Sequence, residues 1–366
     1  MRRHVIMKRI TLCALLMTLF LLLGCGSGQQ AVDSPNGGGA ATGGSSLSSV
    51  LMEVGRSAEN AFYSFLELLS GTLGLRVTKD TTKQQVGDYF NNLGAKLGDA
   101  SAELEQVAKK SEGEGAKDGA LAVAIKEAVD TAKGVLATLK GHVESLGTLG
   151  DANVVGYANN AQGTGTAPDD AQLKEMFRAL KGIVEIATDV GVKALQAGAT
   201  TLTVNGVDNK DGAKILATSG GNPAATDAGK AAIIVAAVSG EEILDSIVKS
   251  GESDSALIAN ATADTTSLKF ALGGTADNLA GSNTPKAAAV AGGIALRSLV
   301  KTGKLAAGAA ANNAGGEKEV QGIGTTAVNK LLVAVEDIIK KTVKNVLKKV
   351  KQEIDQARAS KSAGQQ

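Results

Sequence analysis

Cys25 is the residue whose surroundings most clearly prescribe a chemistry. The apolar run from Ile10 to Gly24 lies directly before it, and a stretch rich in Gly and Ser lies directly after it. Four basic side chains precede the apolar run: Arg2, Arg3, Lys8 and Arg9. A basic segment, an apolar segment and a small residue at the cleavage point are the parts of a signal peptide. The pattern predicts that residues 1–24 are removed by cleavage between Gly24 and Cys25.

A membrane-spanning helix is the alternative interpretation of the same run. Spanning a bilayer takes about 20 apolar residues, and this run is about five residues too short. We therefore favour the signal peptide. Met7 is an alternative start, since Lys8 and Arg9 would still supply positive charge, and the mature chain begins at Cys25 in either case.

The tetrapeptide Leu22-Leu23-Gly24-Cys25 resembles the lipobox of bacterial lipoproteins. That resemblance implies a diacylglycerol on the Cys25 sulfur and a third acyl chain on the Cys25 amine. Each buried CH₂ contributes about 0.8 kcal/mol to membrane binding, and two lipid signals already anchor a protein stably. We expect a tight lipid anchor at Cys25 and no other cofactor.

Cleavage changes the composition that bears on function. The whole chain has 38 Lys and Arg against 37 Asp and Glu, and the loss of four basic residues with acylation of the amine leaves a net charge of about −3. A nearly neutral chain argues against nucleic acid as a partner. Cys13 and His4 leave with the signal, and Cys25 is lipidated. The mature chain then has no free thiol and a single histidine, His142, so we expect no zinc or redox site.

The segment from Gly220 to Ala231 is superficially similar to a phosphate-binding loop. Its glycines Gly221 and Gly229 are eight residues apart instead of five, and Ala231 follows Lys230 where Ser or Thr would bind magnesium. We therefore reject a phosphate site.

Two further sets of polar residues are candidates for chemistry. His142 lies at the boundary of an apolar helical stripe, where a surface or boundary position is expected and catalysis is not. The acidic pairs Glu241-Glu242 and Glu336-Asp337 are expected at helix starts or on polar faces, in contact with solvent. The sequence accordingly predicts no catalytic residue, no metal site and no enzyme.

A lysine-rich segment near the C-terminus is the remaining candidate for binding. Six of its twelve residues are basic: Lys340, Lys341, Lys344, Lys348, Lys349 and Lys351. Such a cluster attracts sulfated glycans or lipid headgroups. It has no aromatic residue for stacking on bases, and its Val and Leu residues fall on a buried stripe. A solvated helix face is the favoured interpretation, and anion binding is the alternative.

The composition predicts how the core is built. The chain has 46 Gly, three Tyr, six Phe and no Trp. A core made from Ala, Val, Leu and Ile suits close helix packing better than a β-sandwich, whose strands favour aromatic and β-branched residues. We predict an all-α fold in the form of a helical bundle.

Apolar residues repeat at helical spacing in three segments of the first half. The predicted helices are Leu47–Leu69, which opens with capping serines, Val86–Val107, and about Ala120–Leu146, with Val135 and Leu139 on its stripe. Steps of three and four along the second segment form a coiled-coil-like seam. Each seam needs a partner helix, which again indicates a bundle.

The second half begins with a long Gly-rich loop. A proline and two aspartates at 168–170 then predict the start of a helix that runs to about Ala197. The Ala-rich segments Gly229–Gly240 and Pro285–Leu296 are also predicted helices. The strongest prediction is a C-terminal helix from about Thr326 through Ile354, because its apolar stripe continues for over eight turns.

Three segments of the second half have few apolar residues to hold them to a core: Gly147–Pro168, Val204–Gly221 and Gly273–Pro285. We expect them to be mobile loops that carry antibody epitopes. The predicted organisation is a signal peptide at 1–24, a lipidated flexible tether at 25–46, one helical domain at 47–360 and a disordered tail at 361–366. The variable loops are expected mainly within 147–325.

Four long phrases resemble the variable large proteins of relapsing-fever Borrelia. They are LSSVLMEVGRSAENAFYSFLELLSGTLG (Leu47–Gly74), VGDYFNNLGAKLGDASAELEQVAKKSE (Val86–Glu112), DGAKILATSGGNPAATDAGKAAIIVAAVSGEEILDSIVKSGE (Asp211–Glu252) and VNKLLVAVEDIIKKTVKNVL (Val328–Leu347). The resemblance implies a lipoprotein on the outer face of the outer membrane. Members are expressed one at a time and replaced by recombination, so that host antibodies lose their target.

The related surface lipoprotein of Lyme-disease spirochaetes suggests an elongated bundle. Its N- and C-terminal helices would be antiparallel, with both termini toward the membrane and Gly-rich loops outermost. We therefore expect an exchangeable surface antigen whose partners are outer-membrane lipid and host antibodies. The alternative is an adhesin that binds host glycosaminoglycan or a matrix protein through lysines such as Lys340, Lys344 and Lys348. The sequence does not specify an oligomeric state.

Overall fold

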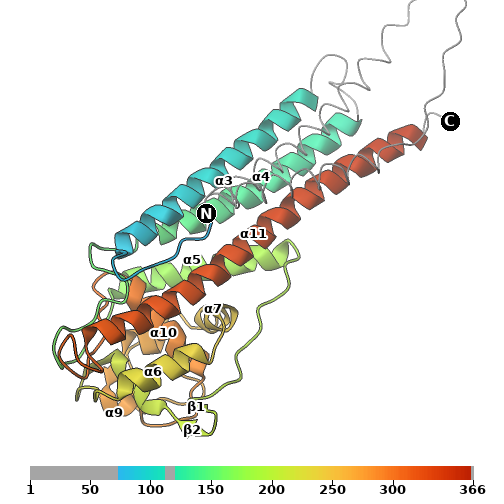
Figure 1. Ribbon diagram of the computed structural model, residues 1–366. Helices are drawn as coiled ribbons and strands as arrows, with labels where there is room; N and C mark the ends of the chain where they lie inside the picture. The colour runs from blue at the N-terminus through green and yellow to red at the C-terminus, as the bar shows by residue number, and fades with distance from the viewer. Residues whose placement is uncertain (1–72, 112–119, 364–366) are drawn as a thin grey trace, which may run out of the picture. The chain divides into compact units, whose positions relative to one another are not determined.

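The computed structural model describes residues 73–111 and 120–363, and within them the regular structure is mostly helical (Figure 1). The long helices are α3 (Lys83–Ser111), α4 (Ala120–Leu146), α5 (Asp170–Asp189) and α11 (Glu317–Ala363). The shorter ones are η1 (Lys210–Leu216), α6 (Asp227–Ala236), α7 (Gly240–Val248), α8 (Ser267–Leu272), α9 (Ala276–Leu279) and α10 (Ala287–Leu299). The predicted all-α class is confirmed.

The strands are short and lie in two separate pairs. β1 (Thr203–Val204) pairs antiparallel with β2 (Val207–Asp208), and β3 (Ala217–Ser219) pairs parallel with β4 (Gly274–Thr275). The register of the first pair places Val204 opposite Val207. The second pair joins the segment after η1 to the segment after α8.

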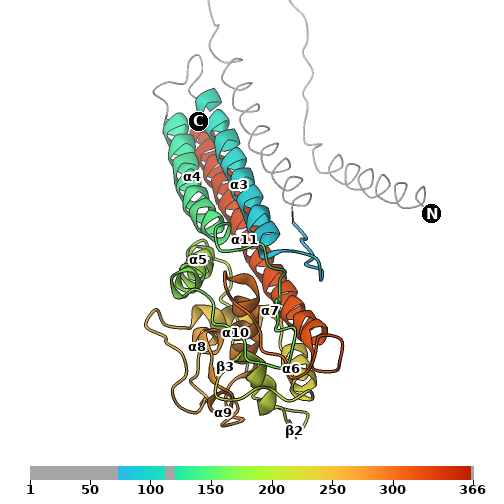
Figure 2. The same cartoon turned by 90° about the vertical axis from the view of Figure 1, so that its left-hand side faces the viewer.

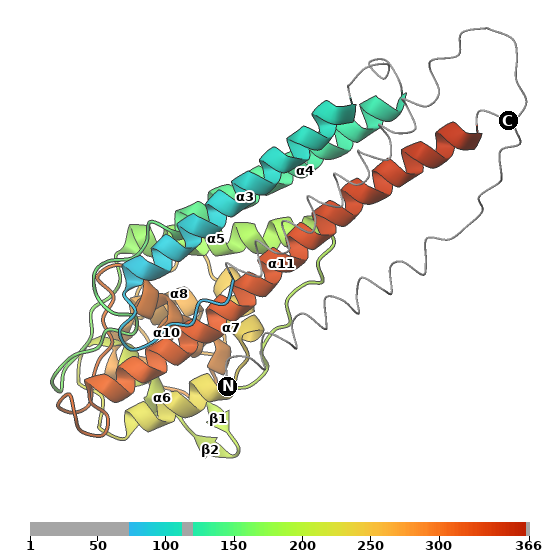
Figure 3. The same cartoon turned by 45° about the horizontal axis from the view of Figure 1, so that its top comes forward.

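α3 and α4 lie side by side (Figures 1 and 3). Their facing apolar side chains are buried as a continuous seam. Leu93 and Leu97 of α3 and Leu139 of α4 are fully buried, as both predicted helices require. One position of the predicted α4 stripe is wrong, because Val135 is only partly buried and Leu136 takes the core position. A step of four from the buried Ala132 follows the 3.6-residue turn better there than a step of three.

α11 has 47 residues and a length of about 70 Å at 1.5 Å per residue. Its C-terminal half lies beside α4, and its N-terminal half contacts α6, α7 and α10 (Figures 1 and 2). We call α3, α4 and the C-terminal half of α11 the stalk. The short helices η1 and α6 to α10, with the two strand pairs, are the cap.

Both ends of α11 extend beyond the prediction. The helix begins at Glu317 instead of about Thr326, with Glu317 and Glu319 in its first turn, where acidic side chains favour the helix dipole. The sequence did not predict this start because Gly322 and Gly324 lie near it, and glycine disfavours helix formation. At the other end the helix continues to Ala363, into the segment 361–366 predicted as a tail.

α5 begins as predicted and ends early. The Asp169 side chain caps it by accepting a 2.9 Å hydrogen bond from the Gln172 amide, with Pro168 just before the cap. The helix ends at Asp189, not near Ala197, because Gly191 adopts a positive φ of 89° that terminates the helix. The segment after it runs without regular structure to the cap.

α10 is the centre of the cap, and all thirteen of its residues are buried. Its small side chains let neighbouring helices come close. A Cβ on Gly293 would lie 2.5 Å from the Phe270 Cβ of α8, so only glycine allows this approach. The two Ala-rich segments predicted as helices are α6 and α10.

The three segments expected to lack ties to the core are in fact held to it. Residues 158–166 form isolated β-bridges with 304–307: Ala158 with Leu305, Gly163 with Ala307 and Thr166 with Lys304. The other two segments bury Ile215, Leu216 and Leu279 completely. These few apolar residues are enough to attach the segments to the core, because backbone hydrogen bonds hold the chain in place between them. The predicted helix Leu47–Leu69 and the tether 25–46 lie outside the described residues.

Candidate functional site

The six lysines of the predicted anion-binding cluster all lie exposed on α11. Two of them are in ion pairs: Lys341 Nζ lies 2.6 Å from Asp337, and Lys351 Nζ lies 2.6 Å from Asp355. The hydrogen bond from Lys341 to Asp337 raises the pKa of the Lys341 ammonium.

Three lysines of the cluster form a row with a different environment. Lys340, Lys344 and Lys348 follow one another at steps of four on the exposed side of α11 and have no acidic partner among the described residues. Like charges at this spacing repel and destabilise a helix by a few tenths of a kcal/mol per pair. A polyanion would relieve that repulsion.

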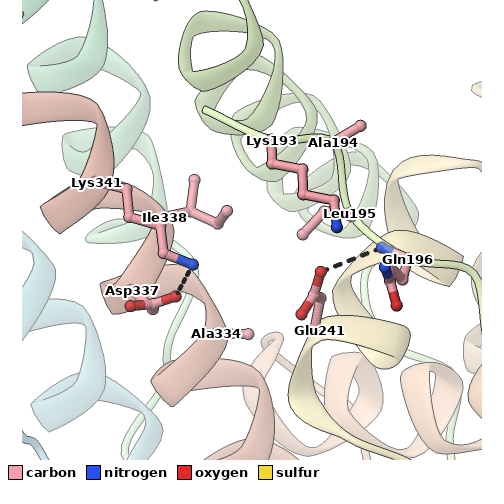
Figure 4. A pocket seen from close by; sticks show the side chains of 9 residues that line it. All are labelled: Lys193, Ala194, Leu195, Gln196, Glu241, Ala334, Asp337, Ile338 and Lys341. Carbon is pink, nitrogen blue, oxygen red and sulfur yellow. Dashed lines mark hydrogen bonds and ion pairs between the residues drawn. The ribbon is translucent and has the colours of Figure 1, made fainter. Parts of the chain in front are cut away.

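A notch of about 270 Å³ opens on α11 at Lys341, between α11, the start of α7 and the segment that leaves α5 (Figure 4). Lys193 and Glu241 face Asp337 and Lys341 across it, and Ile338 of α11 also lines it. Glu241 accepts a 3.2 Å hydrogen bond from the Gln196 amide, and Asp337 binds Lys341.

The notch contains two lysines and two carboxylates, so its charge is balanced, and both carboxylates are already partnered. It has no nucleophile paired with a base. Within the described residues no cluster of His, Cys, Asp and Glu could hold a metal ion. The notch therefore has the character of a polar surface depression, and nothing in it converges on a substrate.

The segment similar to a phosphate-binding loop has a structural role. Lys230 Nζ lies 2.5 Å from Asp211 and 3.9 Å from Asp227. The hydrogen bond to Asp211 raises the pKa of Lys230, and the same bond lowers the pKa of Asp211. This lysine fastens α6 to η1 and is not available to a phosphate.

His142 takes the boundary position that the sequence predicts. It is half-buried on α4, while its neighbour Val143 is fully buried. A Cβ on Gly182 of α5 would lie 2.4 Å from the His142 ring, so the ring packs directly on that glycine. The contact positions α5 against α4.

The prediction that the acidic pairs are solvated is wrong for Glu336. Asp337 and Glu241 are exposed, but the Glu336 residue is only 5% exposed. Its carboxylate accepts a 2.5 Å hydrogen bond from the Tyr89 hydroxyl and bonds of 3.1 and 3.2 Å from the Gly74 amide. Burial and the bond to Glu336 raise the pKa of Tyr89. The carboxylate is buried because α3 and an extended segment supply donors that pattern analysis of α11 alone does not reveal.

Sequence reasoning also missed three lysine and arginine side chains that are buried or half-buried: Lys83, Arg297 and Lys330. Each donates to backbone carbonyls at or just beyond the C-terminal end of a helix. A signal existed for Arg297, which is the one charged residue in the otherwise apolar and small-residue segment 287–299.

The predicted cleavage and lipidation residues, Gly24 and Cys25, lie outside the described residues. Among the helices that are described, none combines the length and apolar character needed to cross a bilayer.

Comparison with known proteins gives matches along nearly the whole chain. Residues 58–354 match the model of the Borrelia lipoprotein family. Variable large protein 7 of Borrelia hermsii is 60% identical over 363 residues, covering 98% of both chains, and variable large protein 18 of the same organism is 62% identical over 369 residues, covering 100% of both. The fold is similar to the crystal structure of the Lyme disease variable surface antigen VlsE of Borrelia burgdorferi. The TM-score is 0.66 at 23% identity, over 85% of this chain and 99% of that one.

Proposed function

The chain belongs to the Borrelia lipoprotein family together with the variable large proteins, and on this premise we propose that it is a lipid-anchored variable antigen on the outer face of the outer membrane. It is not an enzyme. The observation that supports this proposal most directly is that relatives named for their variability match the chain over nearly its full length. About 40% of the aligned positions nevertheless differ between this chain and variable large protein 7.

The fold supplies a physical reason why such differences are tolerated. Stability resides in the stalk seam and the buried cap, where side chains such as Leu97 and Ile294 are fully buried. Exposed substitutions away from such features usually change stability by less than about 0.5 kcal/mol. The surface that antibodies contact can therefore change while the scaffold persists, in keeping with the similar fold of VlsE at 23% identity.

Serum specificity tests the antigenic role. Two isogenic spirochaete lines would display this chain or variable large protein 7, and serum would be raised against the first line. We expect complement-dependent killing of the first line and little killing of the second. Equal killing of both lines would show that the differing positions do not govern antibody recognition, which would contradict the proposal.

Lipid labelling tests the anchor. Cys25→Ser should leave the signal uncleaved at Gly24 and abolish incorporation of radiolabelled palmitate. Cys13→Ser is the matched control, because Cys13 lies within the predicted signal, and it should be processed and labelled normally. Palmitate incorporation and detergent partitioning of the Cys25→Ser protein would contradict the anchor assignment. Protease treatment of intact cells reports surface exposure separately.

An adhesin for host glycosaminoglycan or matrix protein is the second candidate, and the unpaired row Lys340, Lys344 and Lys348 favours it. Binding to immobilised heparin should weaken as salt rises and be lost when all three become Gln. The matched control changes Lys341 and Lys351, which already have acidic partners, to Gln. Equal losses in the two variants would point to overall charge and against this row.

A further inference from the structure

The turn of the β1–β2 hairpin is an asparagine followed by a glycine. Asn205 and Gly206 connect the two strands, and Val204 pairs with Val207 on either side of them. Both turn residues have a positive φ, 51° at Asn205 and 78° at Gly206, which is the backbone that fits the twist of a two-residue hairpin. Figures 1 and 3 show the hairpin at the end of the cap that lies away from α3 and α4.

The reactive groups of this pair are open to solvent. Asn205 and Gly206 are both exposed. Among the described residues, none forms a hydrogen bond with the Asn205 side chain or with the Gly206 amide. Apart from its two chain neighbours, no heavy atom lies within 4 Å of the position that a Cβ on Gly206 would take. The fold therefore protects neither the side-chain amide nor the backbone nitrogen that follows it.

An asparagine before glycine reacts with its own backbone. The Gly206 nitrogen attacks the Asn205 Cγ, a C–N bond forms, and the bond from Cγ to the side-chain nitrogen breaks. The proton lost from the Gly206 nitrogen leaves with the ammonia, and the product is a cyclic imide. Water then adds across either of the two C–N bonds of that ring to Gly206, which gives aspartate or isoaspartate. Glycine favours the attack because it has no Cβ to crowd the nitrogen.

Ring closure requires the hairpin tip, Thr203–Asp208, to open. In the left-handed conformation of Asn205, its Cβ lies opposite the Gly206 nitrogen across the Cα–C bond, so this bond must rotate before the attack. Each strand of the tip has only two residues, and such a ribbon is marginally stable by itself. The base stays fixed, because Leu202 is fully buried and accepts a 2.9 Å hydrogen bond from the Asn209 amide. The tip is therefore able to open without the rest of the cap.

We propose that Asn205 is a self-modification site, where opening of the hairpin tip lets the side chain cyclise onto Gly206 and water converts the imide to aspartate and isoaspartate. The aspartate product adds a negative charge to a tip that already carries Asp208. The isoaspartate product adds a methylene to the backbone, so the Val204–Val207 register is lost. On a surface antigen this tip would change with the age of the molecule. That consequence rests on the proposed function, and the chemistry does not.

A nearby position in η1 supplies a matched control. Asp211 also precedes a glycine, Gly212, but Gly212 is buried and its amide donates a 2.8 Å hydrogen bond to the Asn209 carbonyl. Asp211→Asn would place the same reactive pair where the attacking nitrogen is already bound. The mature chain, with Cys25→Ser to avoid the lipid and the thiol, would be incubated in mildly alkaline buffer made with heavy-oxygen water.

Peptide mapping by mass spectrometry would follow the heavy oxygen that hydrolysis of the imide incorporates. We expect aspartate and isoaspartate to accumulate at residue 205, and the asparagine introduced at position 211 to react at least about tenfold more slowly. The other Asn-Gly pair of the sequence, at 36–37, lies outside the described residues and falls in a different peptide. Asn205→Gly keeps a turn that accepts positive φ and should give no product at this position.

A disulfide across the hairpin tests whether opening controls the reaction. Because the Asn209 amide binds Leu202, the next pair, Thr203 and Asp208, is the one without hydrogen bonds between its residues, where Cβ atoms lie closest. Thr203→Cys with Asp208→Cys fits a disulfide there. The oxidised protein should deamidate at residue 205 about tenfold more slowly than the same protein after reduction.

Amide hydrogen exchange of α10 checks that each variant is folded. No product at residue 205 would overturn the proposal, and so would equal rates at positions 205 and 211. Equal rates in the oxidised and reduced forms would overturn the role of opening. Failure of the serum test would remove the antigenic consequence and leave the chemistry at Asn205 standing.

Discussion

The stalk and the cap are stabilised by different means. The stalk consists of long helices with an apolar seam between them, and its ion pairs, such as Lys133 with Glu105 at 3.0 Å, lie at the surface. The cap consists of helices of four to thirteen residues around α10. Every helix leaves its last four carbonyls without partners inside the helix. Short helices therefore present many such carbonyls per residue, and the cap has to bind them.

Buried and half-buried cations do this in the cap. The Arg297 guanidinium donates to Ala271 and Phe270 at the end of α8 and, at 2.9 Å, to Leu216 at the end of η1. Lys330 donates to Val235 at the end of α6 and to Val238 beyond it. A positive charge is favourable at a helix C-terminus because the peptide dipoles place partial negative charge there. Helix ends take the place of carboxylates as partners for these cations.

Removal of the Arg297 guanidinium should produce the largest effect and is the strongest test of the comparison. The residue is completely buried, and burial lowers its pKa to about 9. Arg297→Met would leave carbonyls of two helix ends unpaired and should lower the free energy of unfolding by about 4 kcal/mol, as measured by urea denaturation. The control Arg178→Met removes an exposed ion pair with Glu252 and should change little. A small loss in Arg297→Met would mean that packing alone holds the cap.

A cavity in the stalk should have a slightly smaller and more local effect. Leu97 is fully buried in the α3–α4 seam, so Leu97→Ala should cost about 3 kcal/mol. Hydrogen exchange should show faster opening of α3 and α4, with α10 amides nearly unchanged. Val123→Ala, at a site that is 51% exposed on α4, is the control and should be close to neutral. Equal loss of protection in α10 would show that stalk and cap unfold as one unit.

Lys83 joins the two regions, and its titration tests that junction. Burial lowers its pKa from 10.5 to about 8, with partial compensation from Asp151. Because the unfolded chain holds this proton up to a higher pH than the folded chain does, stability should rise with pH from about 8 toward 10.5. The expected gain between pH 8 and 9.5 is about 1.5 kcal/mol.

Lys83→Met should remove that part of the rise, so the difference between the two unfolding free energies, measured against pH, isolates the contribution of Lys83. Lys79→Met, at an exposed lysine just before α3, should keep the rise. A flat profile in the unaltered protein, or the same profile in Lys83→Met, would show that the ammonium is not buried at this junction.

The long seams were predictable because each residue contributes to one repeating pattern. Leu93, Leu97 and Leu139 follow directly from helical spacing, and so does the stripe of α11 through Ile354. What the sequence did not reveal depends on contacts between distant segments. From the sequence Glu336 is expected at the surface, and only the folded structure shows that Tyr89 and Gly74 bind it. In the same way Arg297 is an unexplained charge in an apolar helix until the structure shows that it binds the ends of two helices.

The early end of α5 and the early start of α11 were missed for a local reason. Single glycines act in opposite ways at these two positions. Gly191 terminates α5 through a positive φ, whereas Gly322 and Gly324 lie within α11. Nothing in the glycine itself distinguishes the two cases. For the candidate site, the six exposed lysines and the row of three among them were identified from the sequence. That the row has no acidic partner among the described residues could not be, because the pairing of Lys341 with Asp337 and of Lys351 with Asp355 depends on side-chain positions.

The smallest predicted effect compares the same capping motif in the two regions. Ser239 and Glu242 cap the nine-residue α7 reciprocally, with hydrogen bonds of 3.1 and 2.7 Å. Thr82 and Gln85 do the same for the 29-residue α3, with bonds of 3.1 and 2.9 Å. Loss of such a cap costs about 1 kcal/mol.

The nine residues of α7 form few other backbone bonds, so Ser239→Ala should cost that full amount and expose all of α7 to hydrogen exchange. The α3 seam holds the helix beyond its first turn, so Thr82→Ala should fray that turn alone and cost about half as much. If Thr82→Ala costs as much as Ser239→Ala, helix caps contribute equally to stability in the stalk and in the cap. The two regions would then not differ in how strongly their stability depends on satisfied helix ends.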